Sequence, residues 1–279
     1  MNRLLIVDGH NLLFQMFFGM PSRIIGAKGC AIQGVVGFVG AINKLIRLYN
    51  PSHLAVIFDG ERENPRKNIL EEYKANRIDY SVVPDEENPF TQLPLVYEAL
   101  DYMKIAHTET TDCETDDVIA AYALRYGEES EVFISSFDSD YFQLINEHVK
   151  VIRYRGESSV LCDKEYIERK YGVTPSFYLD FKCLVGDTSD NIPGIRGVGP
   201  KTAAKLINDL GGIEEIKARS KEITSDKIRA EIDRSHEVLD RNLALIRLSS
   251  CASLPFTLGE TQLCTDIPRT MDVIHGIGH

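Results

Sequence analysis

The stretch from Gly186 to Leu210, which reads GDTSDNIPGIRGVGPKTAAKLINDL, constrains the fold more than any other part of this chain. Apolar residues recur at helical spacing in 177–185 and again in 200–210, and glycines break the pattern between them. Pro200 suits the first position of a helix, because its missing N–H is not needed there. The stretch therefore predicts two helices joined by a glycine hairpin.

Two kinds of ligand chemistry overlap in this stretch. Asp187 and Asp190 are three residues apart, so a turn or a helix end places both carboxylates on one side. The turn from Gly197 to Gly199 exposes backbone N–H groups at a helix N-terminus, where phosphate binds, and Lys201 and Lys205 add positive charge. The alternative is an ordinary helix-turn-helix corner with a solvated acid pair.

Other acidic residues follow segments that have the pattern of buried strands. The carboxyl ends of parallel strands form the ligand-binding edge of an open α/β sheet, so these acids are expected to meet in one crevice. They are Asp8, Asp59, Asp138 and Asp140, which follow the apolar runs that begin near residues 3, 53 and 131.

A third group of acids, Glu114, Asp116 and Asp117, opens a segment with helical spacing. The helix dipole favours acids in a first turn, and this effect alone explains one or two of them. Three acids within four residues repel one another more than the dipole offsets. A bound cation is the simpler explanation.

The nine acids together indicate the kind of ion. They cannot all stay ionised in one crevice unless cations neutralise them. All the ligands are oxygens, which favours Mg²⁺ or Mn²⁺ over zinc. Two such ions roughly 3.5–4 Å apart would activate a water and stabilise the leaving oxygen of a phosphodiester. A small-molecule phosphatase would explain the acids but not the hairpin with its lysines.

Strands that alternate with helices predict an α/β fold with a parallel sheet and helices on both faces. We expect a catalytic domain over 1–174 and a helical DNA-binding module over 175–279. The connection 61–94 is polar and rich in proline. A connection of this length is usually functional or disordered, and a solvated charged loop is the simplest alternative.

The chain resembles the 5′-nuclease family, which comprises flap endonucleases, bacteriophage 5′-3′ exonucleases and the N-terminal nuclease domain of bacterial DNA polymerase I. The resemblance spans about 4–210. Residues 72–77, EYKANR, match a run of the polymerase I nuclease domains, and 114–117 correspond to the family's E-A-D-D motif. Residues 136–140 depart from the usual T-G-D-x-D but keep both carboxylates. The hairpin stretch matches the family's helix-hairpin-helix.

The resemblance implies a PIN-like core and a helical arch over about 61–94, through which a free 5′ end passes. Lys74 and Arg77 would grip the scissile phosphate, and Tyr73 would stack on a base near it. Arg66 and Lys67 would also contact DNA. Asp85 and the two glutamates after it make this arch less basic than expected.

The family's metal assignment carries over one position at a time. The first ion would be held mainly by Asp8, Asp59, Glu114 and the catalytic Asp116, with Asp117 serving a water or either ion. The second would be held by Asp138, Asp140, Asp187 and Asp190, partly through water. Family members often bind K⁺ in the hairpin turn, and the matching residues are Ser189, Ile195 and Val198.

The net charge of −11 argues against a nucleic-acid partner. Setting the nine acids aside leaves 33 acidic residues against 31 lysines and arginines, which weakens that objection. The N-terminus has the pattern of a buried strand and not of a signal peptide, and no run is long enough to span a membrane. Six cysteines without a CxxC pair indicate reduced thiols in a cytoplasmic protein. We also expect a monomer.

We therefore expect a structure-specific 5′ nuclease that uses two divalent cations, in replication or repair. No polymerase sequence follows, so we expect it to stand alone, like the exonuclease paralogues that bacteria carry beside DNA polymerase I. One alternative is a non-catalytic paralogue that grips branched DNA, although Lys74, Arg77 and all nine acids are present. Another is a PIN-like nuclease directed at RNA, although such domains are usually shorter and lack the hairpin module.

Overall fold

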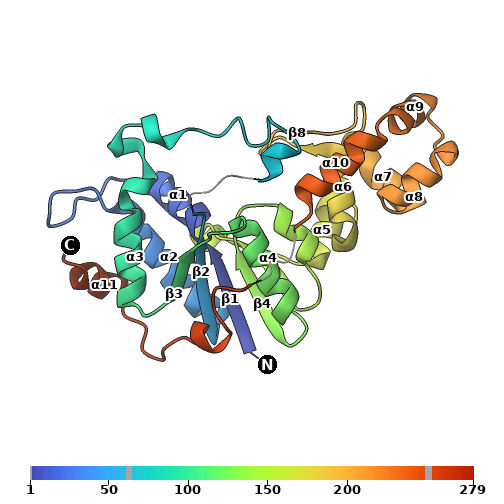
Figure 1. The fold of residues 1–279 in the computed structure, drawn as a ribbon. Coiled ribbons are helices and arrows are strands. Elements are labelled where there is room, and N and C mark those ends of the chain that lie inside the picture. The colour runs from blue at the N-terminus through green and yellow to red at the C-terminus, as the bar shows by residue number, and fades with distance from the viewer. Residues whose placement is uncertain (1, 61–64, 249–252) are drawn as a thin grey trace.

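The computed structural model describes residues 2–60, 65–248 and 253–279 (Figure 1). Its centre is a six-stranded sheet in the order β3-β2-β1-β4-β5-β6. The first five strands in this order run parallel, and β6 is antiparallel to β5. The strands are β1 (Asn2–Asp8), β2 (His53–Phe58), β3 (Ala106–Glu109), β4 (Ser130–Ser135), β5 (Val149–Arg153) and β6 (Val160–Cys162).

Helices cover both faces of the sheet, as the alternating pattern predicts. Successive side chains of β1 point to opposite faces. Leu5 and Val7 pack into one core, and Leu4 and Ile6 pack into the other. The first core is covered by α1 (Gly9–Gly19), α2 (Gln33–Tyr49), α3 (Leu93–Tyr102) and α11 (Thr270–Gly276), and the second by α4 (Thr115–Tyr126) and the helical module. The predicted α/β architecture is confirmed.

The helical module lies at one end of the sheet, at the upper right of Figure 1. The two predicted helices are present as α6 (Tyr178–Val185) and α7 (Pro200–Leu210), and the connection between them contains the β7–β8 hairpin followed by the glycine turn at 197–199. The hairpin consists of β7 (Gly186–Asp187) and β8 (Ile192–Pro193). The other helices of the module are α8 (Ile213–Ala218), α9 (Asp226–Arg234) and α10 (His236–Ile246), and α5 (Lys164–Tyr171), near the end of the predicted catalytic domain, packs beside α7.

The arch region crosses the carboxyl edge of the sheet and reaches the β7–β8 hairpin (Figure 1). Its described part, 65–94, contains four short 3-10 helices, and an α-helix begins only at Leu93, the first residue of α3. The 3-10 helices are η1 (Pro65–Asn68), η2 (Tyr80–Val82), η3 (Asp85–Glu87) and η4 (Pro89–Gln92). Prolines at 84 and 89 interrupt the backbone pattern here and keep the helical turns short. Residues 61–64 of the predicted arch lie outside the described residues.

Two predictions from the sequence concerned the cysteines and membrane-spanning segments. Cys30, Cys162, Cys183 and Cys264 are free thiols. Cys113 is disulfide-bonded, so the expectation of six reduced thiols is wrong for this residue. Within the described ranges, none of the helices combines the length and the apolar character needed to cross a bilayer.

Candidate active site

Asp8 ends β1 and faces the crevice at the carboxyl edge of the sheet. The Asn11 amide donates a hydrogen bond of 3.1 Å to its carboxylate, which caps α1, and the Ser136 hydroxyl donates one of 2.9 Å. Burial, followed by the nearby charge of Asp59, raises the pKa of Asp8 to about 7. Asp8 is therefore a buried carboxylate with other negative charge nearby.

Asp59 directly follows β2, on the strand next to Asp8. The backbone N–H of Thr115 donates 3.2 Å to its Oδ1, and His10 Nδ1 lies 3.8 Å from its Oδ2. Burial would raise the pKa of Asp59, but the hydrogen bonds from His10 and Thr115 outweigh burial and lower it. His10 is a neighbour of the site that the sequence analysis did not identify.

The start of α4 carries three of the predicted acids, and positive side chains from the arch region face them. Arg66 pairs with Glu114 and, at 3.0 Å, with Asp117. Lys74 Nζ lies 3.2 Å from Glu114 Oε1 and 3.9 Å from Asp116 Oδ2. Burial, followed by the charge of Asp138, raises the pKa of Asp116 well above its usual range. The arch region thus neutralises much of the negative charge of this helix start.

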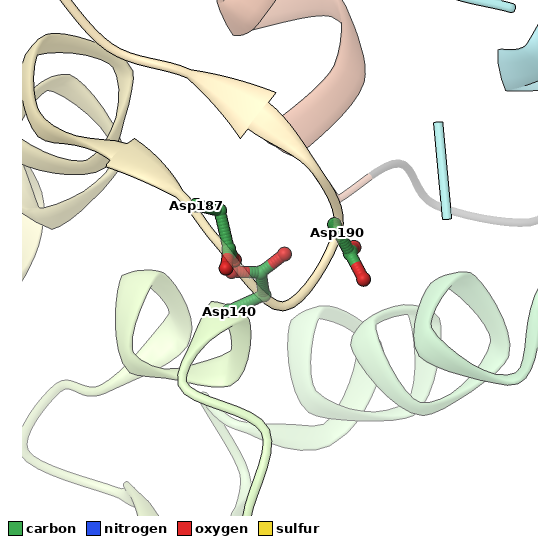
Figure 2. Close-up of side chains that lie close together, drawn as sticks. All are labelled: Asp140, Asp187 and Asp190. Atoms are coloured by element: carbon green, nitrogen blue, oxygen red, sulfur yellow. The ribbon is translucent and has the colours of Figure 1, made fainter. Parts of the chain in front are cut away.

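Asp140, Asp187 and Asp190 form the tightest group of acids. Each offers a carboxylate oxygen, and these oxygens all lie within 4.8 Å of one another. Figure 2 shows Asp140, the first residue of η5 (Asp140–Leu144), against Asp187, with Asp190 beside them on the same hairpin as Asp187. Asp138 adjoins this group, because its Oδ1 accepts a bond of 2.8 Å from the Asp140 amide. Among the described residues, no other set of three potential ligands is this close.

Lys182 of α6 is a site residue that the sequence analysis missed. Its side chain is buried, with 5% of the residue exposed, and its ammonium contacts both Asp140 and Asp187. Burial and then the charge of Asp138 raise the pKa of Asp140, Lys182 partly offsets them, and the net pKa is about 7. Burial would also raise the pKa of Asp187, but Lys182 outweighs it, so that pKa is lowered. A lysine inside the apolar run 178–185 was the available sequence signal.

Asp190 receives its partners from the arch region. The Tyr73 hydroxyl donates a bond of 3.3 Å, Arg77 donates one of 3.1 Å, and Lys74 Nζ lies 3.9 Å away. Burial raises the pKa of Asp190, and the charge of Lys74 offsets part of this effect. The hairpin and the arch region therefore meet at this carboxylate.

Two of the predicted DNA contacts are not accessible in this conformation. Arg66 is 8% exposed and is held by the acids of α4, and Tyr73 is 2% exposed and packs in the core. Neither side chain can reach DNA without leaving these contacts, so the stacking expected of Tyr73 would require it to move. Lys67 and the side chain of Arg77 are exposed.

The glycine turn at 197–199 leads directly into α7, in the place where the sequence predicts a helix start. Gly197 has a φ of +79°, a left-handed conformation that glycine adopts without strain. Gly199 precedes α7, where Lys201 and Lys205 are both exposed. The potassium candidates lie nearby in sequence. The Ile195 carbonyl accepts a bond of 3.0 Å from the Val198 amide, and the Ser189 hydroxyl donates one of 2.5 Å to Asp187.

The donor set fits hard divalent cations. Every candidate ligand is a carboxylate oxygen, the kind of ligand that Mg²⁺ and Mn²⁺ prefer. The Lys182 ammonium lies between Asp140 and Asp187, and the Lys74 ammonium lies among Glu114, Asp116 and Asp190. Carboxylates at this density evidently need positive charge beside them, which divalent ions would supply.

Comparison with protein families places both parts of the chain. Residues 3–172 match the family described as 5′-3′ exonuclease, N-terminal resolvase-like domain. Residues 173–267 match the 5′-3′ exonuclease, C-terminal SAM fold. The chain belongs to the 5′-3′ exonuclease family, and the predicted resemblance is confirmed.

Curated relatives include the thermostable DNA polymerase I of Thermus thermophilus, which is 32% identical over 98% of this chain and 30% of its own length. DNA polymerase I of Bacillus caldotenax is 35% identical over 88% of this chain and 28% of its own length. The chain thus spans less than a third of these relatives, in agreement with the predicted similarity to their nuclease domain.

Solved structures share the fold. A flap endonuclease of bacteriophage T5, in a pseudo-enzyme-product complex with DNA and metal ions, is 25% identical with a TM-score of 0.73, over 88% of this chain and 89% of that one. The catalytic core of Rad2 in complex with a DNA substrate has a TM-score of 0.62 over 99% of this chain and 87% of that one, at 16% identity. The second likeness concerns the fold alone.

Proposed function

We propose that this chain is a structure-specific 5′ nuclease, acting as a 5′-3′ exonuclease and flap endonuclease on DNA in replication or repair. One observation carries the proposal. Asp140, Asp187 and Asp190 converge within 4.8 Å from two parts of the chain, beside the lysine and arginine of the arch region. Such an arrangement can hold cations and a phosphate group side by side. Membership of the exonuclease family supports the same activity.

In this proposal residues 1–174 form the catalytic domain and 175–279 the DNA-binding module. The nine acids hold two divalent ions, Mg²⁺ or Mn²⁺, with the division between them implied by the family resemblance. When bound, such ions activate a water and stabilise the leaving oxygen of an in-line displacement. The boundary between the two family matches, at residue 172, supports the proposed domains. The close group of Asp140, Asp187 and Asp190 supports the proposed metal binding.

The positive side chains then act on the phosphate. Lys74 and Arg77 are now paired with Glu114 and Asp190. When those carboxylates bind divalent cations, both side chains become available to bind the scissile phosphate and stabilise its developing charge. Asp116 remains oriented by the Tyr141 hydroxyl, at 2.7 Å.

The glycine turn at the start of α7 would bind duplex DNA at a distance from the scissile phosphate. The turn at Gly197 to Gly199, with Lys201 and Lys205, would contact backbone phosphates, which gives position without sequence specificity. Lys67 would add a contact from the arch. A K⁺ ion in the turn, near Ser189, Ile195 and Val198, would reinforce phosphate binding. We expect the chain to act as a cytoplasmic monomer.

The test uses a 5′-labelled flap duplex, a blunt duplex and single-stranded RNA, each with Mg²⁺, Mn²⁺ or EDTA. We expect metal-dependent cutting at the flap junction. Asp116→Asn should abolish cutting and keep DNA binding, while Asp272→Asn, an exposed control on α11, should behave as wild type. Tight flap binding without cutting would favour the non-catalytic paralogue. Preferential loss of RNA would favour the RNA-directed nuclease.

A further inference from the structure

Two asparagines join the arch region to the β7–β8 hairpin in a reciprocal way. Asn76 Nδ2 donates a hydrogen bond of 2.9 Å to the Thr188 carbonyl, and Asn191 Nδ2 donates one of 2.9 Å to the Glu72 carbonyl. Each segment thus offers one side-chain amide to the backbone of the other. The two segments are more than a hundred residues apart in sequence, so this contact belongs to the tertiary structure.

Between these bonds lies Lys74, whose backbone N–H donates a bond of 3.0 Å to the Asp190 carbonyl. Lys74 has a φ of +57°, a left-handed conformation that a lysine rarely adopts unless its surroundings hold it there. The side chain leaves this backbone toward the acids, where Nζ lies 3.2 Å from Glu114 Oε1. The contacts on both sides of Lys74 therefore set the direction of its side chain.

We propose that Asn76 and Asn191 are positioning residues that latch 72–77 to the hairpin and so place Lys74 over the acidic site. Both residues are exposed, and their side-chain amides bond backbone carbonyls rather than the acids. Packing in the core does not account for them. The inference rests on the role proposed above for Lys74.

The latch also links two parts of the site that must act together. The hairpin carries Asp187 and Asp190, and 72–77 carries Lys74 and Arg77. Fixing one to the other keeps the cationic groups at a constant distance from the carboxylates. Pre-organisation of this kind matters because a misplacement of about 1 Å can cost up to about 100-fold in rate.

The latch itself is tested by hydrogen exchange, with neither DNA nor metal present. Asn76→Asp and Asn191→Asp keep the side-chain size but replace the donor with a carboxylate that repels a carbonyl, and aspartate tolerates the left-handed backbone of residue 191. We expect amides in 72–77 to exchange about tenfold faster, as loss of a hydrogen bond predicts. Unchanged protection in both variants would overturn the latch.

A matched control is Asn208→Asp. Asn208 is another exposed asparagine whose Nδ2 donates 2.9 Å to a backbone carbonyl, that of Gly172, in the helical module. Its substitution should leave exchange in 72–77 unchanged. Equal acceleration in the control would mean that the effect is general loosening, and would also overturn the latch.

The positioning role is tested by single-turnover cleavage of the flap duplex at saturating enzyme. Asn76→Asp and Asn191→Asp should lower the rate up to about 100-fold, with DNA affinity in EDTA unchanged. If they act through Lys74, then neither should lower the rate further in a Lys74→Ala background. Fully additive losses would overturn the positioning role.

The outcomes separate this inference from the function on which it rests. If Lys74→Ala alone cleaves at the wild-type rate, the role of Lys74 fails, and with it the positioning role. The exchange result then still decides whether the latch exists. If Lys74→Ala cleaves more slowly than wild type but both asparagine variants cleave at the wild-type rate, the role of Lys74 is retained and the positioning role of the asparagines is overturned.

Discussion

The Tyr141 hydroxyl donates a hydrogen bond of 2.7 Å to Oδ1 of Asp116, at the start of α4. Tyr141 is completely buried, and its ring is fixed in the core below the crevice. One oxygen of Asp116 is thereby oriented before any ligand arrives. If Asp116 binds a metal ion as proposed above, the Tyr141 phenol orients that ligand from outside the coordination sphere.

We predict that Tyr141→Phe keeps the fold and weakens the site. The ring volume is unchanged, but Asp116 loses its donor, which for such outer partners costs about 10–100-fold in metal affinity or activity. The measurement is the Mg²⁺ concentration dependence of flap cleavage. Tyr102→Phe, at an exposed tyrosine of α3, is the control. Identical Mg²⁺ dependence in Tyr141→Phe would contradict the prediction.

Lys182→Met should destabilise the protein in EDTA. It removes the buried ammonium between Asp140 and Asp187 and leaves carboxylates without their partner, a loss that typically costs about 3–5 kcal/mol. Mg²⁺ should restore part of the stability, because a cation replaces the missing charge. Urea unfolding with and without Mg²⁺ measures both effects. The control is Lys170→Met, at an exposed lysine of α5, which should change the urea midpoint little. An unchanged midpoint for Lys182→Met in EDTA would refute a stabilising role of the Lys182 ammonium.

The stability of the protein in EDTA should depend on pH through Asp8. Its pKa rises from an ordinary 3.8 to about 7, so between these values the folded chain binds more protons than the unfolded chain. The stabilisation from protonated Asp8 is complete below about pH 4 and is lost as the pH rises through 7. An asparagine at this position cannot ionise, so the stability of the variant does not fall for this reason as the pH rises.

Asp8→Asn should therefore be more stable than wild type at pH 8 in EDTA, by up to about 4 kcal/mol for a shift of this size. The advantage should shrink toward pH 5. Urea unfolding of both proteins at the two pH values measures it. An advantage of the same size at both values would show that the charge of Asp8 is not responsible.

Lys201→Glu should weaken binding to duplex DNA. Lys201 is exposed in the first turn of α7, beside the glycine turn. Loss of one phosphate contact should lower the slope of log affinity against log salt by about 1. Titrations of a catalytically inactive variant over a range of salt concentrations provide the measurement. Lys104→Glu makes the same charge change just before β3, at the opposite edge of the sheet, and equal losses in both variants would argue against a specific contact.

The apolar pattern along the sequence was sufficient to predict the helices and strands in which that pattern is strongly periodic. The run that ends in Asp8 forms β1, the apolar stripe near 34–49 forms α2, and Pro200 begins α7 as its position predicts. Patterns failed where the period was short or weak. The four-residue β3 is polar and partly exposed, and α11 lies in a segment with little apolar periodicity.

The sequence by itself also determined which acids the crevice could contain, because each follows a strand, opens a helix or sits in the hairpin. Only the tertiary structure decided which charge faces which. Lys182 lies between Asp140 and Asp187, and the hydrogen bonds of Asn76 and Asn191 join segments more than a hundred residues apart. Hydrophobic period is set by neighbours along the chain, whereas ion pairs and hydrogen bonds of this kind are set by how distant segments pack. For that reason the sequence predicts a list of candidate carboxylates, whereas their contacts with Lys182 and the arch region follow only from the tertiary structure.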